Sequence, residues 1–247
     1  MIKTAVAISD THSWDSIIEV PTADLLIHSG DLTNIGTKTE ITKSLTWLAS
    51  LPHKHKVFIA GNHDFYLDTH WKAKTPEGER RHGYRPKGTE DEIKELLAQF
   101  PSLIYLNDSG VEIEGLKIWG SPIQPWFHDW GFNRERGAEI SKHWELIPQD
   151  TDILITHGPP FGILDKTVHG QYTGCDNLLK AIASKNIRLH IFGHIHEGRG
   201  ISTRDGGEGK PHKRFLNASS LDEYYEPFPY PYTLIDIENW EILNGKK

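Results

Sequence analysis

Five short apolar runs in this chain each end in a side chain of the kind that binds metal ions. The runs are 6–9, 25–28, 56–60, 153–156 and 189–192, and the side chains that follow them are, in chain order, Asp10, His12, Asp31, Asn62, His157, His194 and His196. Short apolar runs between turn residues predict buried strands. Ligands of α/β sheets bind at the carboxyl ends of strands, so five neighbouring strands would gather these seven donors at one edge.

Seven nitrogen and oxygen donors exceed what one divalent ion takes, since zinc sites use four ligands. A single Asp or His after a strand is usually a turn residue, but five such strand ends together predict a metal site. The set predicts two ions that share a bridging carboxylate and leave positions for water and substrate. Asp31 is the predicted bridge. Strand alternation is expected to place Asp10 and His12 on the same side of the chain.

The stretch Gly61-Asn62-His63-Asp64 is the most specific one in the sequence. Gly61 permits a close approach of the backbone, and Asn62 offers an uncharged oxygen ligand. His63 follows a ligand directly and is expected to point elsewhere, which makes it a candidate general acid beside the ions. Asp64 is expected to hold the His63 imidazole in one tautomer. The predicted catalytic residues are therefore Asp31, His63 and Asp64.

Length and charge narrow the classes of function. A chain of 247 residues can form one large α/β domain, and the spread of the donors from Asp10 to His196 favours a single domain over residues 1–247. The net charge of −7 argues against general binding of nucleic acid backbones. The single cysteine, Cys175, makes no internal disulfide, and the N-terminus is too polar for a signal sequence or membrane span. We therefore expect a cytoplasmic protein without membrane contact.

Periodicity predicts the remaining elements. Helical spacing is found at 36–51, 90–100 and 173–185, and strands are expected at 3–9, 104–106, 111–113, 116–120, 214–217 and 232–237. The three short strands between 104 and 120 have the turn chemistry of a meander and suggest a second sheet packed on the first. The charged, Gly-rich stretch 204–213 reads as an exposed turn between two strands.

Three features leave alternatives open. The basic segment 69–88 reads as an irregular loop, either a lid that contacts anionic substrate or a solvated surface insertion. The aromatic segment 121–132 either walls a pocket and stacks on a ring or fills space under a loop. Cys175 lies near the start of a predicted helix, where it is either an activated thiol or a buried structural residue.

Taken in order, these motifs resemble those of the calcineurin-like metallophosphoesterases. The resemblance rests on Asp10-x-His12, Gly30-Asp31, Gly61-Asn62-His63-Asp64, His157 and Gly193-His194-x-His196. It covers most of the chain and is strongest for the branch of the animal metallophosphoesterase-domain-containing proteins. That branch is echoed in Thr156-His157-Gly158-Pro159-Pro160, Gly193-His194-Ile195-His196-Glu197-Gly198, Asn217-Ala218-Ser219 and the aromatic run Pro125-Trp126-Phe127.

The resemblance implies an α/β fold: a two-sheet β-sandwich flanked by α-helices, in four αββα layers. It implies that one ion is held by Asp10, His12, Asp31 and His196, and the other by Asp31, Asn62, His157 and His194. His63 would stabilise or protonate the leaving group. The mixed donors suit two divalent ions of manganese, iron or zinc, with manganese favoured.

One departure from the family bears on the substrate. Protein phosphatases of this family carry an arginine three residues after the motif aspartate, but here that residue is Asn34, which is no cation. The expected function is therefore a phosphodiesterase that cleaves cyclic nucleotides or other small diesters by attack of a metal-bridging hydroxide. The alternatives are a phosphomonoesterase of the same fold and a non-catalytic regulator that binds metal or nucleotide. The expected partner is a small phosphoester substrate, nucleotides included.

Overall fold

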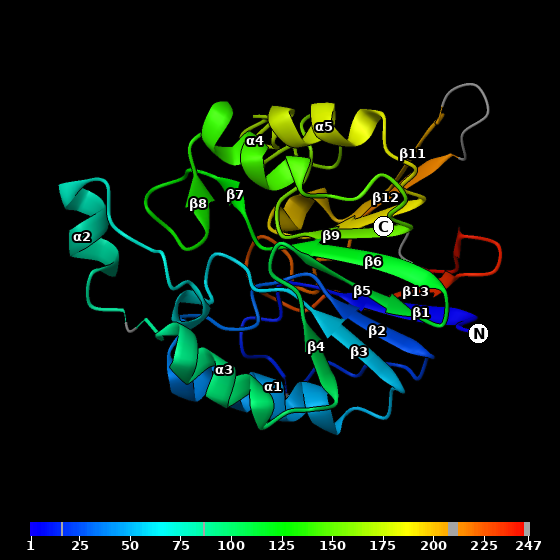
Figure 1. Cartoon of the computed structure of the whole chain (residues 1–247), viewed down its shortest axis with the longest axis horizontal. Helices are drawn as coiled ribbons and strands as arrows, with labels where there is room; N and C mark the ends of the chain where they lie inside the picture. The colour runs from blue at the N-terminus through cyan, green and yellow to red at the C-terminus, as the bar shows by residue number, and fades with distance from the viewer. Residues whose placement is uncertain (16, 86, 207–211, 245–247) are drawn as a thin grey trace.

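Two six-stranded sheets face each other in the computed structural model, and helices cover their outer faces (Figure 1). The structure describes residues 1–15, 17–85, 87–206 and 212–244. The first sheet has the order β14-β13-β1-β2-β3-β4. Its strands are β1 (Thr4–Ile8), β2 (Leu25–His28), β3 (His55–Phe58), β4 (Leu103–Tyr105), β13 (Thr233–Asp236) and β14 (Glu241–Ile242). Strands β1 to β4 run parallel, and β13 pairs antiparallel with β1.

The second sheet has the order β11-β12-β10-β9-β6-β5. Its strands are β5 (Ser109–Ile113), β6 (Leu116–Ser121), β9 (Ile153–Thr156), β10 (Leu189–Phe192), β11 (Gly200–Arg204) and β12 (Lys213–Asn217). The four central strands are parallel, and β11 and β5 pair antiparallel at the two edges. A small separate pair is formed by β7 (Gln124–Pro125) and β8 (Asn133–Arg134).

The core between the two sheets follows from the alternation of side chains along each strand. Ala5 and Ala7 of β1 face inward and share one buried cluster with Ile155 of β9 and Ile191 of β10. The intervening Val6 belongs to a second cluster, which packs against the helices. Strands that are buried on both faces are continuous apolar runs, which is how they read in the sequence.

Two helices cover each sheet. The helices α1 (Lys38–Ser50) and α3 (Glu90–Ala98) lie over the first sheet, and α4 (Ala138–Glu145) and α5 (Asp176–Ala183) lie over the second (Figure 1). Both α1 and α3 begin at a capping box, formed by Thr37 with Glu40 and by Thr89 with Glu92. Shorter elements are α2 (Pro76–His82), η1 (Phe65–Leu67) and η2 (His196–Gly198). The four-layer αββα architecture that we expected is confirmed.

The structure corrects three local predictions. The meander does not form, because β4 pairs with β3 in the first sheet and only the β5–β6 hairpin joins the second. The segment 69–88 is not wholly irregular, since Thr75 caps the helix α2 within it. Helix α4 was not predicted, although Ile140, Trp144 and Ile147 have helical spacing and are buried.

Two further observations concern the predicted turn at 204–213 and the expectation that no segment spans a membrane. Strands β11 and β12 pair antiparallel as expected, while residues 207–211 of the predicted turn between them lie outside the described residues. Within the ranges that the structure describes, no helix is long and apolar enough to cross a membrane.

Candidate metal centre

The five predicted strand ends meet at one edge of the molecule, but they come from both sheets. Strands β1, β2 and β3 of the first sheet and β9 and β10 of the second bring their carboxyl ends together. The expectation that all five runs are neighbouring strands is therefore wrong, because they are divided between two sheets. The seven predicted ligands lie at this junction, and all are buried except His194, which is half-buried: Asp10, His12, Asp31, Asn62, His157, His194 and His196.

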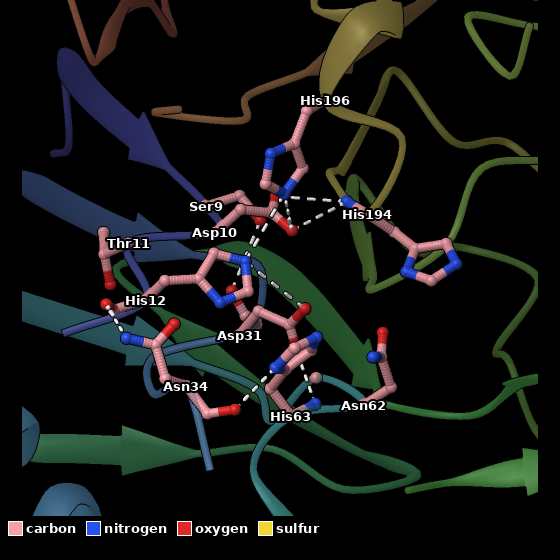
Figure 2. A network of polar contacts seen from close by, with 12 residues as sticks. Ser9, Asp10, Thr11, His12, Asp31, Asn34, Asn62, His63, His194 and His196 are labelled. Carbon is pink, nitrogen blue, oxygen red and sulfur yellow. Dashed lines mark hydrogen bonds and ion pairs between the residues drawn. The ribbon is translucent and has the colours of Figure 1, made fainter. Parts of the chain in front are cut away.

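One group of donors surrounds Asp10. The Nε2 atom of His196 lies 3.4 Å from Asp10 Oδ1 and 3.4 Å from Nε2 of His12. The donor atoms of Asp10, His12 and His196 all lie within 4.8 Å of one another. Figure 2 shows these side chains converging from the loops after β1 and β10.

A second group surrounds His157. Its Nε2 atom lies 3.3 Å from Asp31 Oδ2 and 2.9 Å from Asn62 Oδ1, and His194 completes a cluster with Asp31 and His157 within 4.8 Å. Asp31 Oδ2 is also 3.8 Å from His12 Nε2. Asp31 is therefore placed between the two groups, where the predicted bridge has to be.

The backbone at these positions is not extended. Asp10, His12, Asp31 and His194 have φ angles of 53°, 42°, 53° and 68°. Asp10 and His12 do reach one group of donors, as we expected. The reason is not strand alternation, because both residues are in the left-handed region and the chain turns sharply there. Non-glycine residues in this region cost free energy and concentrate at functional sites.

Two glycines leave room for the carboxylates. A Cβ atom on Gly61 would lie 2.3 Å from the nitrogen and Oδ1 of Asp31, and one on Gly193 would lie 2.0 Å from Oδ2 of Asp10. The close backbone approach that we predicted for Gly61 is confirmed. Any side chain at either position would displace a carboxylate from the centre.

Backbone carbonyls determine which ring nitrogen faces the centre in three of the four histidines. The Nδ1 atoms of His12, His157 and His196 lie 3.2, 3.1 and 2.8 Å from the carbonyl oxygens of Thr33, Ser29 and Asp222. A carbonyl only accepts, so each Nδ1 donates its hydrogen, and in the neutral ring each Nε2 presents a lone pair to the centre. Metal-binding histidines are commonly oriented in this way.

This arrangement fits bound cations. The Nε2 lone pairs of His12 and His196 face each other, and Nε2 of His157 faces the Asp31 carboxylate, so without a proton or cation between them these atoms repel. Burial lowers the pKa of His157, but the charge and hydrogen bond of Asp31, with the charge of Asp10 and the Ser29 carbonyl, together raise it to about 9. Burial likewise lowers the pKa of His196, but its bond with Asp10 raises it to about 9. Divalent ions can take the place of these protons.

His63 is oriented differently from our prediction. Its Nδ1 atom lies 2.7 Å from the carbonyl oxygen of Asn34, and its backbone N–H donates to Oδ1 of Asp31 at 2.7 Å (Figure 2). The prediction that Asp64 orients the imidazole is wrong. The Asp64 carboxylate accepts four hydrogen bonds elsewhere, from Gly61 N, Leu32 N, Thr33 N and Thr33 Oγ1. Asp64 ties the loop after β2 to the loop after β3. It does not reach the His63 imidazole, because adjacent residues in a sharp turn point apart.

Several contacts of the centre were not anticipated from the sequence. Ser219 Oγ donates to Asp10 Oδ2 at 2.9 Å, and the Tyr225 ring lies 4.9 Å from the His12 ring and 5.1 Å from the His196 ring. The only signal for Ser219 was the Asn217-Ala218-Ser219 triplet. Its asparagine is fully buried and donates to Ile195 O at 2.7 Å, which identifies the triplet as structural rather than as a glycosylation site.

The aromatic segment walls a cavity next to the centre. A cavity of about 470 Å³ opens beside His194 and is lined by Trp126, Phe127 and Tyr172. The pocket wall is thus the correct alternative for residues 126 and 127. Cys175 is buried and accepts from Leu178 N at 3.3 Å, and burial raises the pKa of its thiol, so it is the structural residue of the two alternatives.

Comparisons with known proteins agree with this geometry. The model of the calcineurin-like phosphoesterase family matches residues 4–198. The chain is 41% identical over 236 residues to metallophosphoesterase domain-containing protein 1 of Homo sapiens, covering 93% of this chain and 69% of that protein. It is 38% identical to UPF0046 protein K07C11.7 of Caenorhabditis elegans over 88% of this chain and 70% of that one.

Structural similarity points the same way. A solved crystal structure superposes with a TM-score of 0.64 over 98% of both chains, at 16% sequence identity, which shows a shared fold. Because the family model spans most of the chain, this chain belongs to the calcineurin-like phosphoesterases, a family of metal-dependent hydrolases.

Proposed function

We propose that this chain is a dinuclear metal-dependent phosphodiesterase that hydrolyses small phosphodiesters, cyclic nucleotides among them. The observation that carries the proposal is the position of Asp31, whose Oδ2 atom lies between His12 and His157 and so belongs to both donor groups. One ion would be held by Asp10, His12, Asp31 and His196, and the other by Asp31, Asn62, His157 and His194.

Two such cations, when bound, acidify a water molecule and stabilise the charge that develops on the phosphate oxygens. The mixed imidazole, carboxylate and amide donors suit manganese, iron or zinc, and we favour manganese because oxygen donors contribute to both groups.

His63 supplies the proton that the leaving oxygen needs. The bond from Nδ1–H to the Asn34 carbonyl leaves the other ring nitrogen free, and the His63 donor atom lies within 4.8 Å of those of His12 and Asp31. An imidazolium in this position donates its Nε2 proton to the departing alkoxide oxygen, which leaves as an alcohol, and Nδ1–H keeps its hydrogen bond to the Asn34 carbonyl throughout.

Two features support a diester as the substrate. A diester carries a second organic group, and the cavity beside His194 has the volume and the aromatic walls for one. A monoester dianion is best clamped by a cation, but Asn34 is uncharged and its amide donates to the His12 carbonyl at 2.9 Å. The residues that line the cavity include no carboxylate, which suits a neutral or anionic group.

Substrate comparison tests the proposal. Metal-free protein would be reloaded with manganese, iron or zinc and assayed on bis(4-nitrophenyl) phosphate, 4-nitrophenyl phosphate and cyclic nucleotides. We expect kcat/KM for the diesters to exceed that for the monoester by about tenfold or more, an advantage of roughly 1.4 kcal/mol or more. Faster hydrolysis of the monoester would instead identify a phosphomonoesterase. Bound metal without turnover of any ester would identify a non-catalytic regulator.

A further inference from the structure

The imidazole of His63 rests on two supports. One is the carbonyl oxygen of Asn34, 2.7 Å from Nδ1. The other is the indole of Trp130, which stacks on the imidazole with the ring centres 4.2 Å apart and the planes at 27°. The first support lies in the loop after β2, and the second lies in the aromatic segment after β7. The two supports come from distant parts of the chain, so a third group is needed to hold both in place.

Arg85 contacts both supports. Its guanidinium carbon lies 4.9 Å from the centre of the Trp130 ring and 4.6 Å from that of Phe65. Its Nη1 atom donates to the carbonyl oxygen of Ile35 at 2.9 Å and lies 3.5 Å from that of Asn34. A guanidinium can stack on a ring with its face while its edge donates hydrogen bonds, and a lysine ammonium cannot do both.

The loop that carries Asn34 has no freedom to adjust on its own. Gly36, at φ 75°, packs so closely on the next segment that a Cβ atom there would lie 2.3 Å from the carbonyl oxygen of His63 and from the nitrogen of Phe65. The nitrogen of Tyr66 donates to the Gly36 carbonyl at 3.0 Å. A shift of this loop would therefore move His63 as well. Arg85 is hydrogen-bonded to Ile35 in the middle of this loop.

The other arginines of the basic segment have a different environment. Arg80 and Arg81 lie on the exposed face of α2 and pair with Glu77. Arg85 is half-buried and lies outside this pairing with Glu77. Its closest contacts are aromatic rings and backbone carbonyls, which is the environment of a packing group.

We propose that Arg85 is a positioning residue that sets the orientation of His63 in the active site. The proposal rests on the acid role of His63 in the proposed function. Arg85 holds the Trp130 ring and the 34–36 loop together, so that Nδ1–H of His63 stays on the Asn34 carbonyl and the other nitrogen stays directed to the substrate. The basic segment is then neither a lid nor a plain surface insertion, because Arg85 within it holds the two groups that orient the general acid.

Dependence on the leaving group tests this role. A general acid matters most when the leaving oxygen is basic, so the Arg85→Ala enzyme should lose kcat by about tenfold on phenyl diesters and by less on 4-nitrophenyl diesters, with KM unchanged. Arg85→Lys, which keeps the charge and loses the planar fork, should not restore the rate. The control Arg81→Ala removes the same charge from the same segment and should behave as wild type.

A second readout does not need activity. In metal-free protein at one fixed pH above neutrality, nitrogen NMR of His63, assigned with His63→Gln, should show hydrogen on Nδ1 in wild type and a mixture of tautomers in Arg85→Ala. Arg85→Gln serves if Arg85→Ala fails to fold. A folded Arg85 variant with the wild-type tautomer and leaving-group dependence would overturn the proposal, as would full rescue by Arg85→Lys. If wild type hydrolyses no diester, the proposed function fails, while the tautomer measurement still decides whether Arg85 positions His63.

Discussion

The Nε2 atoms of His12 and His196 lie 3.4 Å apart, although 184 positions separate these residues in the chain. Each ring donates its Nδ1–H to a backbone carbonyl, so in the neutral state two lone pairs point at each other. The Asp10 carboxylate lies on the same side, 3.4 Å from His196. Two facing lone pairs beside a buried carboxylate are stable only with positive charge between them, which makes this pair the clearest sign of a cation site.

Loss of the Asp31 carboxylate should remove metal. We expect Asp31→Asn to bind at least one ion fewer per chain than wild type, because Asp31 Oδ2 faces both donor groups. Elemental analysis of purified protein after reloading with manganese measures this directly. The control Asp91→Asn changes an exposed aspartate at the start of α3 and should keep the full content. Full retention of metal by Asp31→Asn would rule out the bridge.

His63 should be needed for turnover but not for metal. We expect His63→Ala to keep its metal content while kcat on diphenyl phosphate, whose leaving oxygen is basic, falls by about 10² to 10⁴, the usual contribution of a general acid. Parallel metal analysis and steady-state kinetics measure both quantities. His70→Ala, at an exposed position outside the centre, is the matched control. Unchanged turnover in His63→Ala would exclude His63 from the chemistry.

A methyl group at Gly193 should disrupt the centre. Because its Cβ atom would lie 2.0 Å from Asp10 Oδ2, we expect Gly193→Ala to lose about 1–3 kcal/mol of stability and to bind metal weakly. Gly158→Ala is the control, since a Cβ atom there would make only ordinary van der Waals contacts, at 3.8 to 4.0 Å, with Gln124 and His194. Urea unfolding and metal titration compare the two. Equal stability of both variants would show that the centre tolerates displacement of Asp10.

Acid should destabilise the fold through His190. Burial lowers the pKa of His190 to about 3, and its Nε2 atom lies 2.8 Å from Thr156 Oγ1. Below its ordinary pKa of about 6.5 the unfolded chain binds a proton that the folded chain does not, so stability is present above that pH and is lost as the pH falls toward about 3.

The size of this effect can be measured in metal-free protein. Between about pH 7.5 and pH 5, His190 should account for a loss of about 2 kcal/mol in the free energy of unfolding, since each unit below 6.5 is worth about 1.4 kcal/mol. Urea unfolding at both pH values should show a smaller loss in His190→Leu. An identical loss in the variant would mean that His190 does not carry this part of the acid sensitivity.

The aromatic cavity should contribute to the binding of aryl diesters. Phe127 and Tyr172 are 54% and 55% exposed, and both line the cavity beside His194. We expect Phe127→Ala and Tyr172→Ala each to raise KM about fivefold with kcat unchanged, as for the loss of roughly 1 kcal/mol of uniform binding. Tyr230→Ala changes an exposed tyrosine that does not line the cavity and should have no effect. A fall in kcat alone would contradict this role.

The strands and most of the covering helices follow from local patterns. The apolar runs became buried strands, and the capped segments with Thr37 and Thr89 became helices, because period and cap chemistry act over a few residues. Helix α4 was missed because no side chain caps its start at Gly137, and α2 because a basic composition hides its Thr75 cap.

The seven candidate metal donors could be named from the sequence because each one lies within four residues after the end of a strand, and a strand end is a local feature. Which strand joins which sheet could not be read in the same way, since an apolar run carries no record of its partner. Packing of the two sheets decided that His12 meets His196. It also placed the His63 imidazole against Asn34 and Trp130 instead of the adjacent Asp64, because contacts between distant segments exist only once the core has formed.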